Sequence, residues 1–382
     1  MAKKLYVEVG GKTRKAKKGY VSVNGKARKI KKAYVGVNGK ARAFWSGGEL
    51  RYYGRATALS VPRYDLTATA TGSYALFAGG TFAKPSNVVD AYNRSLTRTN
   101  PAGLEKYVVH IAASVGQYAI IATNDLSSTF ITTVADSYVI YDKSLTKTSN
   151  NIGTTVKART GKGAANVGNY ALFAGGNLIP KFGTKEPVNT INAINSSLTL
   201  SSITLSKAKC AVCGGKVGNY ALFAGGFAGS LLKPSYYTDV DAYNASLTRI
   251  SVAATRTCAL LELGSASIGS SYALFRIGTD ADFDIDAYDT SLTRRTVIVP
   301  GPGNASFVPM AATSSENYAI FANKSFVVAY DDALTCYMPT PLSDGRTNGA
   351  AAAIGNYVLF AGGISSSGDT SQKDIVDVYT ID

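Results

Sequence analysis

The chain has 382 residues, of which 46% are hydrophobic and 17% charged, with 38 Gly and 24 Tyr. This composition excludes a disordered chain and favours a β-rich, turn-dense fold. The lysine-rich N-terminus lacks an apolar signal-peptide core, and no run of about 18 apolar residues could form a membrane helix. We therefore expect a protein made in the cytoplasm without a signal peptide.

The net charge of +15 is concentrated at one end of the chain. Residues 1–48 contain 14 Lys and Arg against the single Glu8, so this segment carries +13 and the remaining chain only +2. Any electrostatic partner therefore concerns residues 1–48.

Residues 1–48 contain three copies of a 14-residue repeat, which begin at Tyr6, Tyr20 and Tyr34. Asn24-Gly25 and Asn38-Gly39 are two-residue turn signals between short alternating strands, so we predict basic β-hairpins. The segment has few apolar residues to bury, and we expect it to order on a partner or on copies of itself, as an attachment or oligomerisation segment. The basic residues that we expect to anchor it are Lys15, Lys17, Lys18, Arg28, Lys29, Lys31 and Lys32.

A second repeat fills residues 49–382. The heptapeptide YALFAGG, or a variant of it, begins at Tyr74, Tyr118, Tyr170, Tyr220, Tyr272, Tyr318 and Tyr357. A VDAYN-type segment follows each copy, and in six repeats a Ser-Leu-Thr or Ala-Leu-Thr turn comes next. Short apolar runs broken by Gly pairs and Asx-Xaa-Ser turns indicate strands in tight antiparallel hairpins. We predict seven four-stranded blades, that is, an all-β, seven-bladed propeller.

The last repeat ends at Asp382 after its third strand. The segment Leu50-Arg51-Tyr52 precedes the first repeat at the spacing of a fourth strand. We therefore predict that it completes blade seven, which would join the two ends of the propeller and remove exposed sheet edges.

These repeats resemble the kelch family. Arg63, Arg159, Lys209 and Arg346 lie upstream of anchor tyrosines, and Gly pairs stand at 79–80, 175–176, 225–226 and 362–363. The segment Met338 to Gly363 is the most similar to the family pattern. Blades two, five and six lack the Gly pair, and Leu of the SLT turn stands in place of the usual Trp. The resemblance implies the fold but no partner, because kelch propellers have many functions.

The residues offer little for catalysis, and we expect neither an enzyme nor a cofactor or metal. Galactose-oxidase-like kelch enzymes use a copper site with imidazole ligands, whereas His110 is the single histidine here. Cys210 and Cys213 form one CxxC without a second pair, and Cys258 and Cys336 are isolated. A carbohydrate-active propeller is a weaker alternative that needs paired carboxylates. We interpret the recurrent aspartates as structural: Asp90, Asp241, Asp286 and Asp377.

The connections between second and third strands differ most between blades, and in propellers such loops on a rigid frame carry function. Three of them are long and mix apolar, aromatic and basic residues, as an interaction surface would. The candidate binding residues are Phe82, Lys84, Leu178, Ile179, Lys181, Phe182, Leu231, Leu232, Lys233, Tyr236 and Tyr237. The alternative is that they only pack over neighbouring blades.

The basic hairpin repeats resemble N-terminal segments of tail, baseplate or fibre-like proteins of bacteriophages. This resemblance implies a virion structural protein that attaches to the particle through residues 1–48, as a possible trimer, and contacts a host-surface glycan or protein through the propeller. The alternative is a nucleic-acid-associated hub protein, because lysine-rich segments give strong, salt-sensitive, sequence-independent binding to phosphates.

Overall fold

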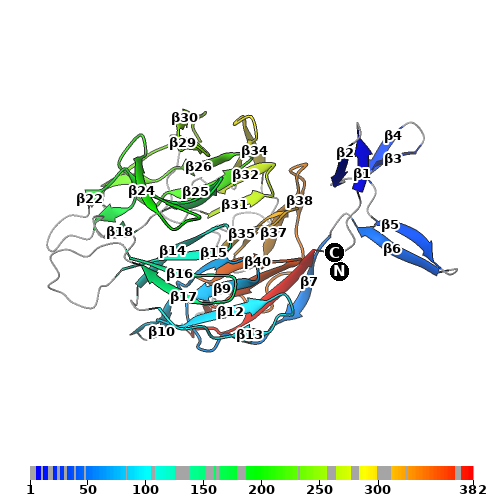
Figure 1. The fold of residues 1–382 in the computed structure, drawn as a ribbon, viewed down its shortest axis with the longest axis horizontal. Coiled ribbons are helices and arrows are strands. Elements are labelled where there is room, and N and C mark those ends of the chain that lie inside the picture. Colours follow the sequence, from blue (N-terminus) through cyan, green and yellow to red (C-terminus); the bar gives the residue numbers. More distant parts are fainter. Residues whose placement is uncertain are drawn as a thin grey trace.

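The computed structural model describes residues 49–382 except 83, 105–107, 125–136, 151–158, 161–162, 179–185, 231–232, 256–263, 277–283, 299–310, 324–325, 366–370 and 382; within residues 1–48 it describes the backbone of six strands. The described residues of the main body form seven four-stranded antiparallel sheets arranged around a common axis (Figure 1). The predicted seven-bladed propeller is confirmed. No helix among the described residues is long and apolar enough to span a membrane.

The blades are given from the central channel outward. Blade one has β8 (Thr67–Ala70), β9 (Tyr74–Ala78), β12 (Val89–Asn93) and β13 (Arg98–Thr99). Blade two has β14 (Val108–Val115), β15 (Tyr118–Asn124), β16 (Ser137–Tyr141) and β17 (Lys147–Asn150). Blade three has β19 (Gly163–Val167), β20 (Tyr170–Ala174), β23 (Thr190–Asn195) and β24 (Leu200–Thr204). Blade four has β25 (Cys213–Val217), β26 (Tyr220–Ala224), β29 (Val240–Asn244) and β30 (Arg249–Ser251).

The remaining blades follow the same order. Blade five has β31 (Gly264–Ile268), β32 (Tyr272–Arg276), β33 (Asp284–Asp289) and β34 (Arg294–Ile298). Blade six has β35 (Ala311–Ser314), β36 (Ala319–Ala322), β37 (Val327–Tyr330) and β38 (Cys336–Tyr337). Blade seven has β40 (Ala350–Ile354), β41 (Tyr357–Ala361), β43 (Val376–Ile381) and β7 (Leu50–Arg55). As predicted, each anchor heptapeptide supplies the second strand.

The first strands contact one another in a closed circle, β8–β14–β19–β25–β31–β35–β40–β8, and so surround the channel. One end of the ring carries the tight turns between first and second strands and those between third and fourth strands. We call this end the turn face. The opposite end, the loop face, carries the connections between second and third strands and those from one blade to the next.

The second and third strands have no solvent-facing side, because each blade packs between two others. In β9, for example, Ala75 and Phe77 join a cluster with blade seven, and Leu76 and Ala78 join a cluster with blade two. Seven such apolar clusters lie between successive blades. Alternate residues of a strand point to opposite faces, so a strand buried on both faces must be apolar throughout. This requirement explains the YALFA sequence.

The Leu of the third turn packs into the same interblade clusters. In six blades this Leu adopts a left-handed backbone, with φ of 60° at Leu96 and 64° at Leu145, a conformation that costs a non-glycine residue about 1 kcal/mol or more. The preceding Asx side chain holds the turn: Asn93 Oδ1 accepts hydrogen bonds from Ser95 N at 2.9 Å and Thr97 N at 3.0 Å. Leu96 meets the cluster between blades seven and one.

Polar bonds also join the blades. The third-strand tyrosine donates its hydroxyl to a backbone carbonyl in the connection from the preceding blade, at 2.8 Å from Tyr92 to Thr57 and 2.7 Å from Tyr379 to Thr340. Burial raises the pKa of both phenols. The Gly pairs make a second link, since Gly363 N donates to Arg63 O of blade one at 2.9 Å. A Cβ on Gly362 would lie 2.6 Å from that same carbonyl.

The predicted closure by the segment at Leu50 is confirmed. β7 pairs antiparallel with β43, with Leu50 opposite Ile381 and Tyr52 opposite Tyr379. Tyr52 also donates its hydroxyl to Asp377 Oδ1 at 3.0 Å. Leu50 is buried in the cluster between blades six and seven, where no SLT leucine is available.

Within residues 1–48 the described backbone forms three two-stranded ladders that lie outside the ring of blades (Figure 1). They pair β1 (Tyr6–Val9) with β2 (Lys12–Lys15), β3 (Tyr20–Val23) with β4 (Lys26–Lys29), and β5 (Lys32–Val37) with β6 (Lys40–Ser46). Each ladder leaves a two-residue connection, at 10–11, 24–25 and 38–39. The latter two are the Asn-Gly pairs of the sequence.

Removing β7 should be far more damaging than removing the hairpins. A chain that starts at Glu49 keeps a closed ring, whereas one that starts at Ala56 exposes the unpaired edge of β43 and the apolar Leu50 site. We expect the longer chain to unfold close to the full-length melting temperature, and the shorter one to melt well below it and aggregate. Calorimetry and light scattering measure both quantities. Equal stability of the two shortened chains would contradict the closure.

Candidate binding surfaces

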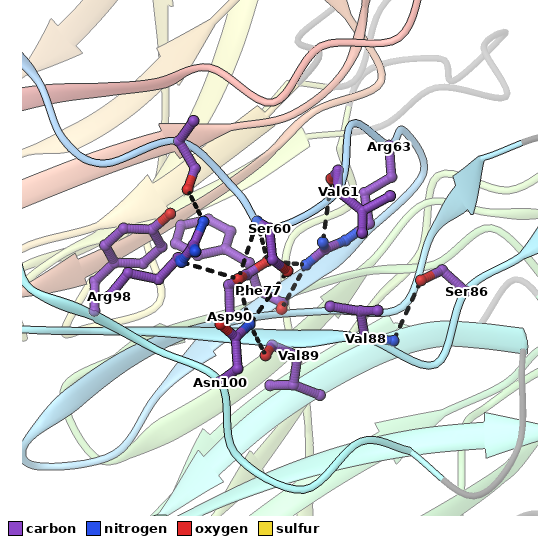
Figure 2. Close-up of polar contacts among 12 residues, drawn as sticks. Ser60, Val61, Arg63, Phe77, Ser86, Val88, Val89, Asp90, Arg98 and Asn100 are labelled. Atoms are coloured by element: carbon purple, nitrogen blue, oxygen red, sulfur yellow. Dashed lines mark hydrogen bonds and ion pairs between the residues drawn. The ribbon is translucent and has the colours of Figure 1, made fainter.

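The recurrent aspartates are buried inside the blades. Asp90, Asp241, Asp286 and Asp377 are at most 3% exposed. Figure 2 shows Asp90 among its partners: Arg63 Nη2 lies 2.8 Å from Oδ2, and Asn100 Nδ2 donates to Oδ1 at 2.7 Å. The arrangement leaves no open position for a metal or a substrate at Asp90. The structural interpretation of these residues therefore agrees with their surroundings.

Blades four and seven repeat this arrangement with their own basic residues. Arg346 Nη1 lies 2.7 Å from Asp377 Oδ2, and its other nitrogens donate to backbone carbonyls of Gly362 and Phe360. In blade four Lys209 Nζ lies 2.6 Å from Asp239 Oδ2 and 3.5 Å from Asp241 Oδ2. In each of these blades the kelch-like basic residue thus joins the segment that precedes the first strand to the third strand, beneath the loop face.

Two of these groups have shifted pKa values. Burial lowers the pKa of Arg63, an effect opposed by the charge of Asp90. Burial by itself would raise the pKa of Asp239, but hydrogen bonds and positive charge from Lys209 and Lys207 together bring it below its usual value. The Arg63 shift thus follows from burial and the Asp239 shift from its ion pairs, and both groups belong to structural pairs rather than to a reactive centre.

The described residues contain no group of three or more His, Cys, Asp or Glu side chains placed to hold a metal ion. Cys210 and Cys213 are buried, and Cys210 Sγ lies 3.4 Å from Phe227 O. His110 belongs to β14, but its side chain lies outside the described residues, as does all of Cys258.

The loop face carries small β-ribbons built from the variable connections. They are β10 (Thr81–Phe82) with β11 (Lys84–Pro85), β18 (Arg159–Thr160) with β21 (Asn177–Leu178) and β22 (Glu186–Pro187), β27 (Phe227–Ser230) with β28 (Lys233–Tyr236), and β39 (Arg346–Thr347) with β42 (Ile364–Ser365). The ribbons of blades three and four contact each other through β22 and β27. These ribbons are the part of the repeat that differs most between blades.

The structure brings some of the predicted binding residues to this face and leaves others outside description. Lys84 is exposed in β11, and Leu178 is partly buried in β21. Phe82 and Lys233 are placed by their backbone only. Ile179, Lys181, Phe182, Leu231 and Leu232 lie outside the described residues. Of the predicted anchoring residues, Lys15, Arg28, Lys29 and Lys32 lie in hairpin strands, and Lys17, Lys18 and Lys31 lie outside the described residues.

The two tyrosines of blade four are less exposed than their sequence context indicates. Tyr236 packs against the cluster between blades four and five, with its ring 6.1 Å from that of Phe227. Lys207 Nζ lies 4.9 Å above the ring of Tyr237. Tyr236 therefore packs over the neighbouring blade, which is the alternative that the sequence left open.

The central channel is a second surface, and sequence reasoning missed it. It encloses about 590 Å³ and is lined by all seven first strands. The lining is mostly Ala, Gly, Ser and Thr, and the charged lining residues are Lys216 and Glu316. Lys216 is four residues before its anchor Tyr220, so aligning the seven repeats on their anchors would have revealed it as the one charged residue at that position.

We expect that the buried pair of Arg346 and Asp377 can be replaced together with little loss of stability, but that replacing one residue alone is strongly destabilising. Arg346→Ala leaves Asp377 buried without its main cation, a change that costs about 3–5 kcal/mol. Blades two and six carry Tyr107 with Val139 and Phe307 with Val328 at the corresponding positions. We therefore expect the double variant Arg346→Phe, Asp377→Val to recover much of the loss.

Urea denaturation measures these differences, with Arg51→Ala as control. Arg51 pairs with Glu49 at a site where both side chains are more than half exposed, so its removal should change the free energy of unfolding by less than about 1 kcal/mol. A double variant no more stable than Arg346→Ala would contradict the prediction.

Asp239 should make stability depend on pH. Its pKa is lowered in the folded protein, so its contribution is complete above the unfolded pKa of about 4 and disappears as the pH falls through the lower folded value. The stability difference between wild type and Asp239→Asn should therefore shrink between pH 5 and pH 2.5. Urea midpoints at both pH values test this, and an unchanged difference would refute it.

Comparison with known proteins finds similarity of fold only. No family model and no curated protein sequence matches the chain. Among solved structures, a streptogramin B lyase structure is similar with a TM-score of 0.56 and 12% identity, over 88% of this chain and 98% of that one. The structure of YjhT is similar with a TM-score of 0.52 and 10% identity, over 86% of this chain and 99% of that one. The chain is a seven-bladed β-propeller that resembles both.

Proposed function

We propose that this protein is a non-enzymatic binding protein, whose propeller recognises a partner through the loop face while residues 1–48 attach it to a larger assembly. The observation that carries the proposal is that the recurrent residues of the repeat and its variable connections have different roles. The recurrent charged and aromatic residues hold blades together, as Asp90 and Tyr92 do. The ribbons of the loop face, in contrast, differ between blades in the number and length of their strands.

The chemistry of the described residues favours binding over catalysis. A glycoside hydrolase requires two accessible carboxylates flanking the substrate. The recurrent aspartates are instead inside ion pairs and hydrogen bonds, as in the pairing of Asp377 with Arg346. The carbohydrate-active alternative is therefore the least supported.

The assembly that we propose is a phage virion, in its tail, baseplate or fibre. The support is the resemblance of the basic hairpin repeats to attachment segments of such proteins, together with a charge of +13 in 48 residues. In this setting the hairpins bind other virion proteins or form a trimer, and the loop face contacts a host-surface glycan or protein. The protein would be made in the bacterial cytoplasm.

The same charge favours a second function, which is binding of nucleic acid by residues 1–48. A segment that neutralises several phosphates binds duplex DNA with an affinity that falls steeply with salt. The propeller would then act as a hub beside the nucleic acid.

One comparison separates the two. Light scattering and duplex-DNA binding at several salt concentrations are measured for the full chain and for the chain that starts at Glu49. Under the virion proposal the full chain forms oligomers, the shortened chain is monomeric, and DNA binding at physiological salt is negligible. A full-length monomer that binds DNA with a steep salt slope would favour the nucleic-acid function instead.

The loop face has its own test. The chain from Glu49 is applied to an array of bacterial surface glycans, and each hit is repeated with Lys84→Glu and with the matched control Lys143→Glu. Lys84 is exposed on the loop face and Lys143 is exposed on the turn face. We expect Lys84→Glu to weaken binding several-fold and Lys143→Glu to leave it unchanged, whereas equal effects would exclude recognition by the loop face.

A further inference from the structure

One ring of residues in the channel departs from the small, neutral lining. Seven first-strand positions are equivalent, because each pairs with the second residue of its anchor strand. They are Ala70, Ser114, Asn166, Lys216, Ser267, Ser314 and Ala353. Blades two to six supply polar residues here, which we call the polar arc, and Lys216 is its middle member.

The ring next to it is almost featureless. The positions two residues earlier are Ala68, Ala112, Ala164, Gly214, Ser265, Ala312 and Ala351. Small side chains at this level keep the channel open behind the polar arc. The channel volume of about 590 Å³ lies within the range of roughly 300–1,000 Å³ that is typical of small-molecule sites. In blade four only Val217 separates Lys216 from the turn at Gly218–Asn219, so the arc lies near the turn-face mouth.

The hydrogen bonds of the arc leave donors without acceptors. Ser267 Oγ accepts a hydrogen bond from Lys216 N at 3.0 Å, and Ser314 Oγ accepts one from Ser267 N at 2.7 Å. Each hydroxyl oxygen therefore accepts a hydrogen bond from a backbone N–H of the adjacent first strand. Neither hydroxyl proton is donated to a described residue. A serine hydroxyl carries one proton to donate in addition to its lone pairs.

Lys216 adds a positive charge beside these two hydroxyls. Its side chain is partly buried, and no carboxylate of the described residues lies within ion-pairing distance of it. The hydrogen bond between these two first strands does not require a lysine, because Ser267 Oγ accepts it from the backbone N–H of Lys216 and not from the side chain. An ammonium group and two hydroxyl groups that line the same end of the channel match the requirements of an oxyanion.

We infer that the polar arc binds an oxyanion group, a carboxylate or a phosphate, of a small molecule that enters the channel from the turn face. Lys216 supplies the charge, Ser267 and Ser314 donate hydroxyl hydrogen bonds, and the alanine level above accommodates the uncharged remainder of the ligand. Glu316 lines the same part of the channel and weakens binding of a dianion more than of a monoanion. This site is separate from the loop face and from residues 1–48, and does not depend on the proposed function.

The test is titration calorimetry of the full-length protein with inorganic phosphate and, in a separate arm, with acetate, at constant ionic strength. Residues 1–48 also attract anions, so the informative quantity is the difference between variants that share them. We expect Lys216→Met to weaken binding at least tenfold and Lys216→Arg to stay within a few-fold of wild type. The exposed Lys143 on the turn face provides the matched control Lys143→Met, which should have no effect.

Two further variants define the site. Ser314→Ala should weaken binding several-fold, and Glu316→Gln should strengthen phosphate binding more than acetate binding. Circular dichroism and the melting temperature without anion show that each variant is folded. Equal affinities of wild type and Lys216→Met, or no binding of either anion beyond what residues 1–48 account for, would overturn the inference. Binding in only one arm identifies which oxyanion the site accepts.

Discussion

The backbone pairing of β7 with β43 is the constraint on which the rest of the structure depends. Blades two to six each pack between neighbours that precede and follow them in the chain, but blades one and seven meet only if the ends of the propeller are joined. The pairing of Leu50 with Ile381 makes that joint, and Leu50 fills the apolar site that the SLT leucine fills elsewhere. An open ring would expose two sheet edges and an apolar cluster.

Closure also determines which residues of the repeat remain available for binding. Each blade must bury both faces of its central strands and bond to its neighbours. Its recurrent charged and aromatic residues therefore make contacts inside the propeller. Arg346, Asp377 and Tyr379 of blade seven all make such bonds. Two regions are exempt from this demand: the loop face, where connections vary in length, and the channel, where first strands have one side facing no neighbour.

These two regions are chemically different. The loop face offers ribbons with exposed basic and partly buried aromatic residues, which suit a large partner. The channel offers an enclosed space with one lysine in an arc of hydroxyl and amide groups, which suits a small partner. They lie at opposite ends of the second strands, so a ligand in the polar arc would not touch a partner on the loop face.

The sequence by itself determined the number of blades, the strand order, the closing segment and the turns, because each has a local pattern. YALFA is apolar throughout since both faces of the strand are buried, and Asn or Asp before Ser-Leu-Thr caps a tight turn. Only the tertiary structure decided that Tyr236 packs over the next blade and that Lys216 faces the channel beside Ser267 and Ser314. Those neighbours come from different blades, about 50 residues apart for each step around the ring, and local patterns carry no information about such distances.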